Sequence, residues 1–191
     1  RVNNAEQLDV MPLVGDFNFY GGIYRDVQLL VTERVCISPL DYASPGVYLH
    51  QRQVTADEAT VEAEVLVSGT GSGEQALTAR IEVCDGQRTV ATCTREVTAT
   101  GEGGTSRMML PVTIGKPHLW DGTADPFMYR AKVSLWQAGR LVDEVEQPLG
   151  LRFFRVDPEK GFFLNGRHLP LHGVCRHQDR PEIGNALSNA H

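Results

Sequence analysis

The sequence has no long apolar run and no excess of basic residues. Its 191 residues include 18 lysines and arginines against 24 aspartates and glutamates, which gives a formal net charge of −6. Because nucleic-acid-binding proteins normally carry a basic face, we expect no nucleic-acid partner. A bilayer-spanning helix needs about 20 apolar residues, and no segment approaches that length, so we expect no membrane partner. The first residues also lack the basic and apolar regions of a signal peptide, which leaves the compartment open.

Cysteine is scarce as well. The four residues Cys36, Cys84, Cys93 and Cys175 are too few for a disulfide-rich scaffold. Cys84 and Cys93 flank a predicted turn at 85–87, and in an antiparallel hairpin their offset along the strands is about 15 Å. That offset is well beyond the reach of a disulfide. All four cysteines are therefore predicted to be free thiols.

Helical periodicity is nearly absent, and apolar residues alternate with other residues instead. This period of two is typical of strands that bury one face. Between residues 35 and 150 it predicts about seven short strands, separated by turns rich in Gly, Asp and Ser. They lie within residues 46–54, 60–67, 77–83, an arm ending at 97, 108–114, 127–135 and 141–145. This spacing predicts an all-β, immunoglobulin-like sandwich, although the Cys–Trp–Cys core of antibody domains is missing.

The two ends of the chain carry other patterns. Residues 23–31 predict one more strand, and because a single strand cannot bury itself, we expect it to belong to a preceding β domain. Beyond Gly150, two apolar stretches around 157–161 predict a hairpin. Asn165-Gly166 then turns the chain into residues 168–174. The chain is expected to be an internal piece of a multidomain protein that stops where another domain begins.

One cluster near the C-terminus has the composition of a metal site. It contains His168, His172, Cys175 and His177, all of them zinc-ligand types. On a strand the first two would face away from the last two, so surface histidines at a strand end are the alternative to zinc. The sequence contains no Gly-x-Ser-x-Gly element for a serine nucleophile. Cys175 beside His177 lacks the third group that would orient a thiol nucleophile.

Three separated motifs follow one another over nearly the whole chain. The first is DFNFYGGIYRDV at 16–27, and the second is LWD at 119–121 followed by DPFMY at 125–129. The third runs from GLR at 150–152 through FLNG to HGVCRHQD at 172–179. In this order and spacing they resemble glycoside hydrolase family 2, the group of β-galactosidases and β-glucuronidases.

The resemblance implies a layout for the chain. In the family a jelly-roll sugar-binding domain precedes an immunoglobulin-like sandwich, and a TIM barrel with the active site follows. On that layout residues 1–32 are the end of the jelly roll and residues 33–150 are the sandwich. Residues 151–191 are a hairpin and the first barrel strand, at 169–174. Active sites of such barrels lie at the C-terminal ends of the strands.

The resemblance also implies a function for the parent protein. The expected activity is that of a retaining exo-β-glycosidase, first of all a β-galactosidase, whose two catalytic glutamates act in a pair. Both glutamates lie further along the barrel in the family, so the chain alone is expected to be inactive. A β-glucuronidase or β-mannosidase of the same family is the alternative. Cys175 and Gln178 stand where the family often has Asn and Glu, which leaves the choice among the three sugars open. Outside the family, an independent immunoglobulin-like binding module is the competing hypothesis.

Four residues are carried over as substrate contacts. His177 matches a histidine that hydrogen-bonds the sugar, and Arg176 and Asp179 are expected beside it at the rim of the pocket. Asp16 matches an aspartate that reaches the sugar hydroxyls and a bound monovalent cation. The structural alternatives are that Asp16 orders a turn and that His177 caps the end of a strand.

The remaining expectations concern supporting residues and partners. Arg25 and Asp26 are expected to form a structural ion pair, and Trp120 is expected to be a buried aromatic residue of the sandwich. We expect no cofactor in the chain itself, with Mg²⁺ or Na⁺ left open for the parent enzyme. The implied partner is a carbohydrate, a β-galactoside, and a homo-oligomer is left open. The compartment would be the cytoplasm or periplasm of a bacterium.

Overall fold

The computed structural model describes Ala5 and residues 20–69, 75–99 and 104–190. The chain divides into two compact units. One consists of residues 31–171, and the other joins described residues among the first 30 to residues 172–190. The described residues contain strands, turns and extended segments and no helix, so this part of the chain is all-β. Accordingly, it offers no helix with the length and hydrophobicity needed to cross a bilayer.

All described strands lie in the unit formed by residues 31–171. The seven strands expected from the alternating pattern are confirmed as β2 to β8. The pattern did not predict β1, because three residues are too few to show alternation. The strands are β1 (Val35–Ile37), β2 (Val47–Val54), β3 (Glu58–Gly69), β4 (Gln75–Asp85), β5 (Arg88–Ala99), β6 (Thr105–Gly115), β7 (Tyr129–Gln137), β8 (Arg140–Leu149), β9 (Phe154–Asp157), β10 (Gly161–Leu164) and β11 (Arg167–His168).

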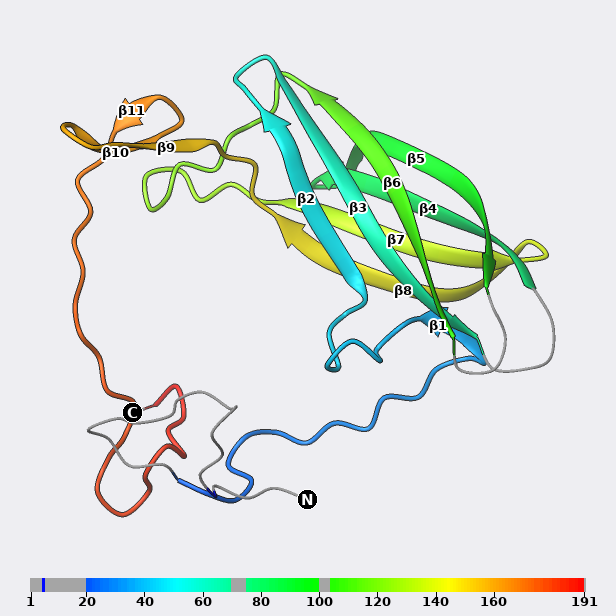
Figure 1. Cartoon of the computed structure of the whole chain (residues 1–191), viewed down its shortest axis with the longest axis horizontal. Helices are drawn as coiled ribbons and strands as arrows, with labels where there is room; N and C mark the ends of the chain where they lie inside the picture. The colour runs from blue at the N-terminus through cyan, green and yellow to red at the C-terminus, as the bar shows by residue number, and fades with distance from the viewer. Residues whose placement is uncertain (1–4, 6–19, 70–74, 100–103, 191) are drawn as a thin grey trace. The chain divides into compact units, whose positions relative to one another are not determined.

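Strands β1 to β8 form two four-stranded antiparallel sheets that pack face to face (Figure 1). In the first sheet β3 pairs with β6 along one edge and with both β1 and β2 along the other. The second sheet has the order β5-β4-β7-β8. The predicted immunoglobulin-like sandwich is therefore confirmed as the architecture of this unit.

The core lies between the two sheets and consists of the apolar half of each alternating pattern. In β3, for example, Val61, Ala63 and Val65 are completely buried, while Glu62 and Glu64 form ion pairs with side chains of neighbouring strands. Full burial of a valine or leucine side chain contributes about 1.5–3 kcal/mol. The same alternation fills the core from the other strands, with Leu77, Ala79, Ile81, Val83, Met108, Leu110, Val112, Ile114, Tyr129, Ala131, Val133 and Leu135.

Charged side chains between the core positions pair across the strands. The ion pairs include Arg52–Glu62 at 2.8 Å, Arg107–Glu64 at 3.0 Å, Lys132–Glu82 at 3.5 Å, Lys132–Glu144 at 3.6 Å and Arg130–Glu146 at 3.2 Å. Partly exposed pairs of this kind contribute about 0–1 kcal/mol each. These glutamates are part of cross-strand ladders, as expected for the polar positions of half-buried strands.

A loop at residues 38–46 connects β1 to β2, which share one edge of β3. The chain leaves and rejoins this edge at Leu66, whose carbonyl accepts from the Ser38 N–H and whose N–H donates to the Gly46 carbonyl, both at 2.8 Å. Gly46 has φ +71°, and a Cβ there would lie 2.4 Å from the Ser38 carbonyl oxygen. Only glycine fits this close return of the chain.

Strands β9, β10 and β11 form a small antiparallel meander after the sandwich. It confirms both turns that the sequence predicted beyond Gly150. Asn165 and Gly166 have φ +50° and +82°, as a two-residue type I′ hairpin turn requires. At the other turn, the Asp157 carboxylate accepts from the backbone N–H groups of Lys160 and Glu159. These two bonds hold the pKa of Asp157 below its usual range.

Two predicted strands are absent from the structure. Residues 23–31 form no strand, and Val27, Leu29 and Val31 are 78%, 90% and 83% exposed. Residues 169–174 form none either, with Val174 93% exposed. Both segments have suitable residues, but a strand also needs a neighbour that completes its hydrogen bonds and covers its apolar face. No described strand pairs with either segment.

The four cysteines are free thiols, as predicted. Across the β4–β5 hairpin Cys84 lies opposite Thr89, whereas Cys93 lies opposite Ile81. The two sulfurs therefore occupy different levels of the hairpin. Cys36 in β1 is buried, and this burial raises the pKa of its thiol.

Candidate functional site

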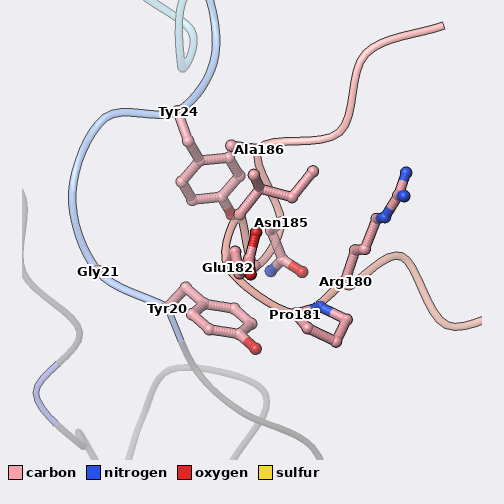
Figure 2. Close-up of a pocket in the computed structure, with 10 residues that line it drawn as sticks. Tyr20, Gly21, Tyr24, Arg180, Pro181, Glu182, Asn185 and Ala186 are labelled. Carbon is pink, nitrogen blue, oxygen red and sulfur yellow. The ribbon is translucent and has the colours of Figure 1, made fainter. Parts of the chain in front are cut away.

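A pocket lies in the smaller unit, between the first sequence motif and the turn at residues 180–186 that follows the third motif (Figure 2). It has a volume of about 400 Å³. Tyr20 and Tyr24 line one side, and the turn at residues 180–186 lines the other, with the polar side chains of Glu182 and Asn185. The pocket therefore brings together segments that are about 160 positions apart in the sequence.

Arg25 holds these two segments together. Its guanidinium donates to the Asn185 carbonyl at 2.7 Å and to the Tyr24 carbonyl at 3.0 Å, and it lies 4.9 Å from the centre of the Tyr24 ring. The ion pair predicted between Arg25 and Asp26 is thus wrong. An arginine can saturate carbonyl oxygens and stack on a ring at once, and its sequence neighbour plays no part in that contact.

The turn at 180–186 has a defined backbone. Arg180 and Gly184 exchange two hydrogen bonds, from the Arg180 N–H at 3.2 Å and from the Gly184 N–H at 2.9 Å. The Tyr20 ring packs directly on Gly184, where an added Cβ would lie 2.9 Å from the ring. Glu182 has φ +75°, an uncommon conformation for a residue with a side chain. The wall of the pocket is therefore fixed by backbone bonds and by close packing.

The lining has the chemistry of a binding site. Aromatic faces can pack on apolar surfaces of a ligand, the Asn185 amide can donate and accept hydrogen bonds, and the Glu182 carboxylate can accept them. Retaining glycoside hydrolysis needs two carboxyl groups about 5–5.5 Å apart. Glu182 is the only carboxylate in the described lining. The pocket as described supplies contacts for a ligand and no catalytic pair.

The predicted substrate contacts lie next to this pocket in sequence. Arg176, His177 and Asp179 are all exposed in the segment that leads to Arg180, and none of them lines the pocket. Asp16 lies outside the described residues. The structure thus brings Tyr20, Tyr24 and the turn together and leaves the roles of these four residues as predictions.

The zinc alternative receives no support from the described residues. They contain no group of three or more His, Cys, Asp and Glu side chains that could hold a metal ion. His168 belongs to β11, where its ring contacts Phe163 edge to face with centroids 5.4 Å apart. His172, Cys175 and His177 follow on an exposed, extended segment.

In the larger unit, parts of the second and third motifs form a junction between the sandwich and the meander. The Trp120 N–H donates to the Leu151 carbonyl at 2.8 Å. The Asn165 side chain donates to the Trp120 carbonyl at 3.0 Å and accepts from the Phe153 N–H at 3.2 Å. Leu151 itself is completely buried in the core. One amide side chain thus joins the hairpin turn to a sandwich loop.

Two cations reinforce this junction. Arg167 pairs with Asp121 at 2.8 Å, and the Arg152 guanidinium lies 5.3 Å from the centre of the Trp120 ring. Trp120 lies beside Gly150 and is half-buried, so it is less buried than the sequence predicted. Sequence reasoning missed the junction, although it singled out every segment that contributes to it.

Comparison with known proteins places these motifs in one family. The sequence profile of glycosyl hydrolases family 2 matches residues 46–152. A β-glucuronidase of Bacteroides fragilis is 56% identical over 100% of this chain and 27% of that protein. A β-galactosidase of Bacteroides ovatus is 30% identical over 98% of this chain and 21% of that protein.

The chain is also similar to a solved structure. The crystal structure of a Bacteroides uniformis β-glucuronidase matches with a TM-score of 0.89 and 31% identity, over 99% of this chain and 23% of that one. The chain therefore spans about a quarter of the length of these relatives. Since the family profile covers more than half of the chain and a close relative covers all of it, the chain belongs to glycosyl hydrolases family 2.

Proposed function

We propose that this chain is the sandwich section of a longer retaining exo-β-glycosidase. The observation that carries the proposal is the junction between the sandwich and the meander. There, hydrogen bonds of Trp120, Leu151 and Asn165, residues of the second and third motifs, attach the meander to the sandwich. A scaffold that sets the position of a following catalytic domain needs such a connection. A free-standing binding module, the competing hypothesis, would need neither the meander nor its attachment.

The substrate is proposed to be a terminal β-glucuronide. The relative that is 56% identical bears the name β-glucuronidase, whereas the β-galactosidase of Bacteroides ovatus is 30% identical. The β-galactoside expected from the motifs is therefore the second candidate. The two sugars differ in the configuration at C4 and in the C6 group, which is a carboxylate in a glucuronide and a hydroxymethyl group in a galactoside.

In this proposal the chain contributes contacts to the sugar, and a later part of the protein contributes the catalytic glutamates. His177 would donate to a sugar hydroxyl, with Arg176 and Asp179 beside it. Asp16 would reach the sugar from the first motif and bind a monovalent cation, and Mg²⁺ or Na⁺ is a candidate elsewhere in the enzyme. Residues 1–191 alone would turn over no glycoside, because no retaining carboxylate pair is expected in them.

The test uses the full-length protein with 4-nitrophenyl β-D-glucuronide and 4-nitrophenyl β-D-galactoside. The glucuronide should give the higher kcat/KM. His177→Asn should lower that kcat/KM by about 10²-fold, the usual loss for one hydrogen bond that acts in the transition state. His168→Asn, a matched change on β11, should have little effect. Equal effects of the two variants would refute the role of His177, and turnover by residues 1–191 alone would refute the scaffold assignment.

A further inference from the structure

Asn165 is the only asparagine of the sequence that glycine follows. The other five asparagines precede Asn, Phe or Ala. Asparagine is a chemically labile residue, and it deamidates most readily before glycine, because a residue without a Cβ leaves its backbone nitrogen open to approach. The dipeptide forms the turn between β10 and β11, where Asn165 is half-buried and Gly166 is exposed to water.

The turn itself requires this reactive pair. Asn165 and Gly166 have φ +50° and +82°, and asparagine followed by glycine is the pair that adopts such a turn with the least strain. A Cβ at position 166 would lie 4.0 Å from the Phe153 ring, an ordinary contact. The backbone conformation, and not a lack of space, therefore demands glycine after Asn165.

The fold binds both polar atoms of the Asn165 side chain. Its nitrogen donates to the Trp120 carbonyl at 3.0 Å, and its oxygen accepts from the Phe153 N–H at 3.2 Å. The Asn165 N–H also donates to the Phe153 carbonyl at 2.9 Å. The two side-chain bonds must break before the amide carbon can turn onto the Gly166 nitrogen. The junction between the sandwich and the meander therefore restrains the reaction.

We propose that Asn165 is a deamidation site whose reaction proceeds when this junction opens. The Gly166 backbone nitrogen gives its proton to hydroxide and attacks the side-chain amide carbon of Asn165. The bond from that carbon to the side-chain nitrogen breaks, and the nitrogen takes a proton from water and leaves as ammonia. The product is a cyclic succinimide, which water opens at either carbonyl to give aspartate or isoaspartate. Water and hydroxide are the only reactants required.

Neither product restores the junction. Aspartate places a carboxylate oxygen where the amide nitrogen donated to the Trp120 carbonyl, so two acceptors face each other. Isoaspartate in addition lengthens the backbone of the turn by a methylene group, which disturbs the pairing of Leu164 with Arg167. Arg167 also pairs with Asp121 at 2.8 Å, on the sandwich side of the junction. Deamidation therefore loosens the attachment of the meander irreversibly.

Peptide mapping of the full-length protein, aged at mildly alkaline pH, tests the proposal. The peptide that contains Asn165 should gain the mass of deamidation and should become a substrate of an isoaspartyl methyltransferase, which marks the succinimide route. In protein unfolded by guanidinium chloride the reaction should be roughly 5- to 150-fold faster, if each side-chain bond has ordinary net strength. Asn189, which is exposed, is the internal control and should react slowly and at similar rates in both states.

Two variants distinguish opening of the junction from unfolding of the whole sandwich. Leu151 and Leu110 are both completely buried, but it is the Leu151 carbonyl that accepts from the Trp120 N–H at the junction. Leu151→Ala should therefore accelerate deamidation of the folded protein more than Leu110→Ala does. Equal acceleration would overturn the proposal, and so would equal rates at Asn165 in the folded and unfolded protein, a comparison that needs no variant. Deamidated protein whose Phe153 N–H exchanges as slowly as before would overturn the predicted loosening.

Discussion

Replacing Asn165 by glycine removes the side chain that joins the hairpin turn to the sandwich while leaving the turn itself favourable. The side chain makes two hydrogen bonds, to the Trp120 carbonyl and from the Phe153 N–H. Each contributes about 0.5–1.5 kcal/mol net. We therefore expect Asn165→Gly to destabilise the junction by about 1–3 kcal/mol. Glycine adopts the native φ of +50° without steric cost.

Two further variants separate the contributions at this position. Asn165→Ala removes the same hydrogen bonds and adds about 1–2 kcal/mol for the left-handed backbone, of which about 0.4–1 kcal/mol is offset by the lower flexibility of alanine in the unfolded chain. It should be the more damaging variant. Asn165→Asp keeps the acceptor for Phe153 but turns an oxygen toward the Trp120 carbonyl, so it should lose the second bond alone.

Amide hydrogen exchange measures the effect where it occurs. A loss of about 2 kcal/mol corresponds to roughly 30-fold faster exchange at the Phe153 N–H, if exchange follows local opening. Amides in the centre of β3, such as that of Val61, should keep their protection. Unchanged exchange at the Phe153 N–H in Asn165→Gly would refute the argument that the Asn165 side chain closes the junction. Slower exchange there in Asn165→Ala than in Asn165→Gly would refute it too.

Three other predictions concern the sandwich and the meander. Leu151→Ala should lower the free energy of unfolding by about 2–5 kcal/mol in urea titrations, because Leu151 is completely buried; a change below 1 kcal/mol would contradict its place in the core. Gly46→Ala should lower the melting temperature clearly, because its Cβ would lie 2.4 Å from the Ser38 carbonyl oxygen. In the control variant Gly86→Ala the added Cβ meets open space, so only the strain of the left-handed backbone should lower the melting temperature. Equal shifts of the melting temperature in the two variants would contradict this reasoning. The pKa of Asp157 is lower in the folded protein than in the unfolded chain. The ionised carboxylate therefore stabilises the β9–β10 turn above the unfolded pKa of about 3.9, and this stabilisation is lost as the pH falls through the folded pKa. Exchange in the β9–β10 turn should therefore accelerate in acid, and Asp157→Asn should abolish that pH dependence.

The strands of the sandwich could be predicted because each one records its two faces in the sequence. Val61, Ala63 and Val65 alternate with polar residues, and the structure buries all three of them completely. Val27, Leu29 and Val31 also lie at every second position and yet belong to no strand. Alternation reports which residues could occupy a sheet, while the presence of a neighbouring strand depends on the rest of the fold.

The contacts of the candidate site were harder to predict, because most of them join a side chain to a distant backbone group. Arg25 binds the Asn185 carbonyl and Asn165 binds the Trp120 carbonyl. A carbonyl oxygen is the same in every residue, so no residue type marks the partner in the sequence. The motifs identified the segments that meet, and only the structure could show which atoms join them.

The return of the chain at Leu66 has a consequence for how this fold can vary. Ser38 and Gly46 both form backbone hydrogen bonds with Leu66. The residues between them therefore leave the edge of the sheet and return to it at the same residue of β3. Their number can change without altering the register of any strand. The position is a natural insertion point, where related proteins can exchange loops of different length and where a foreign peptide could be displayed on an intact sandwich.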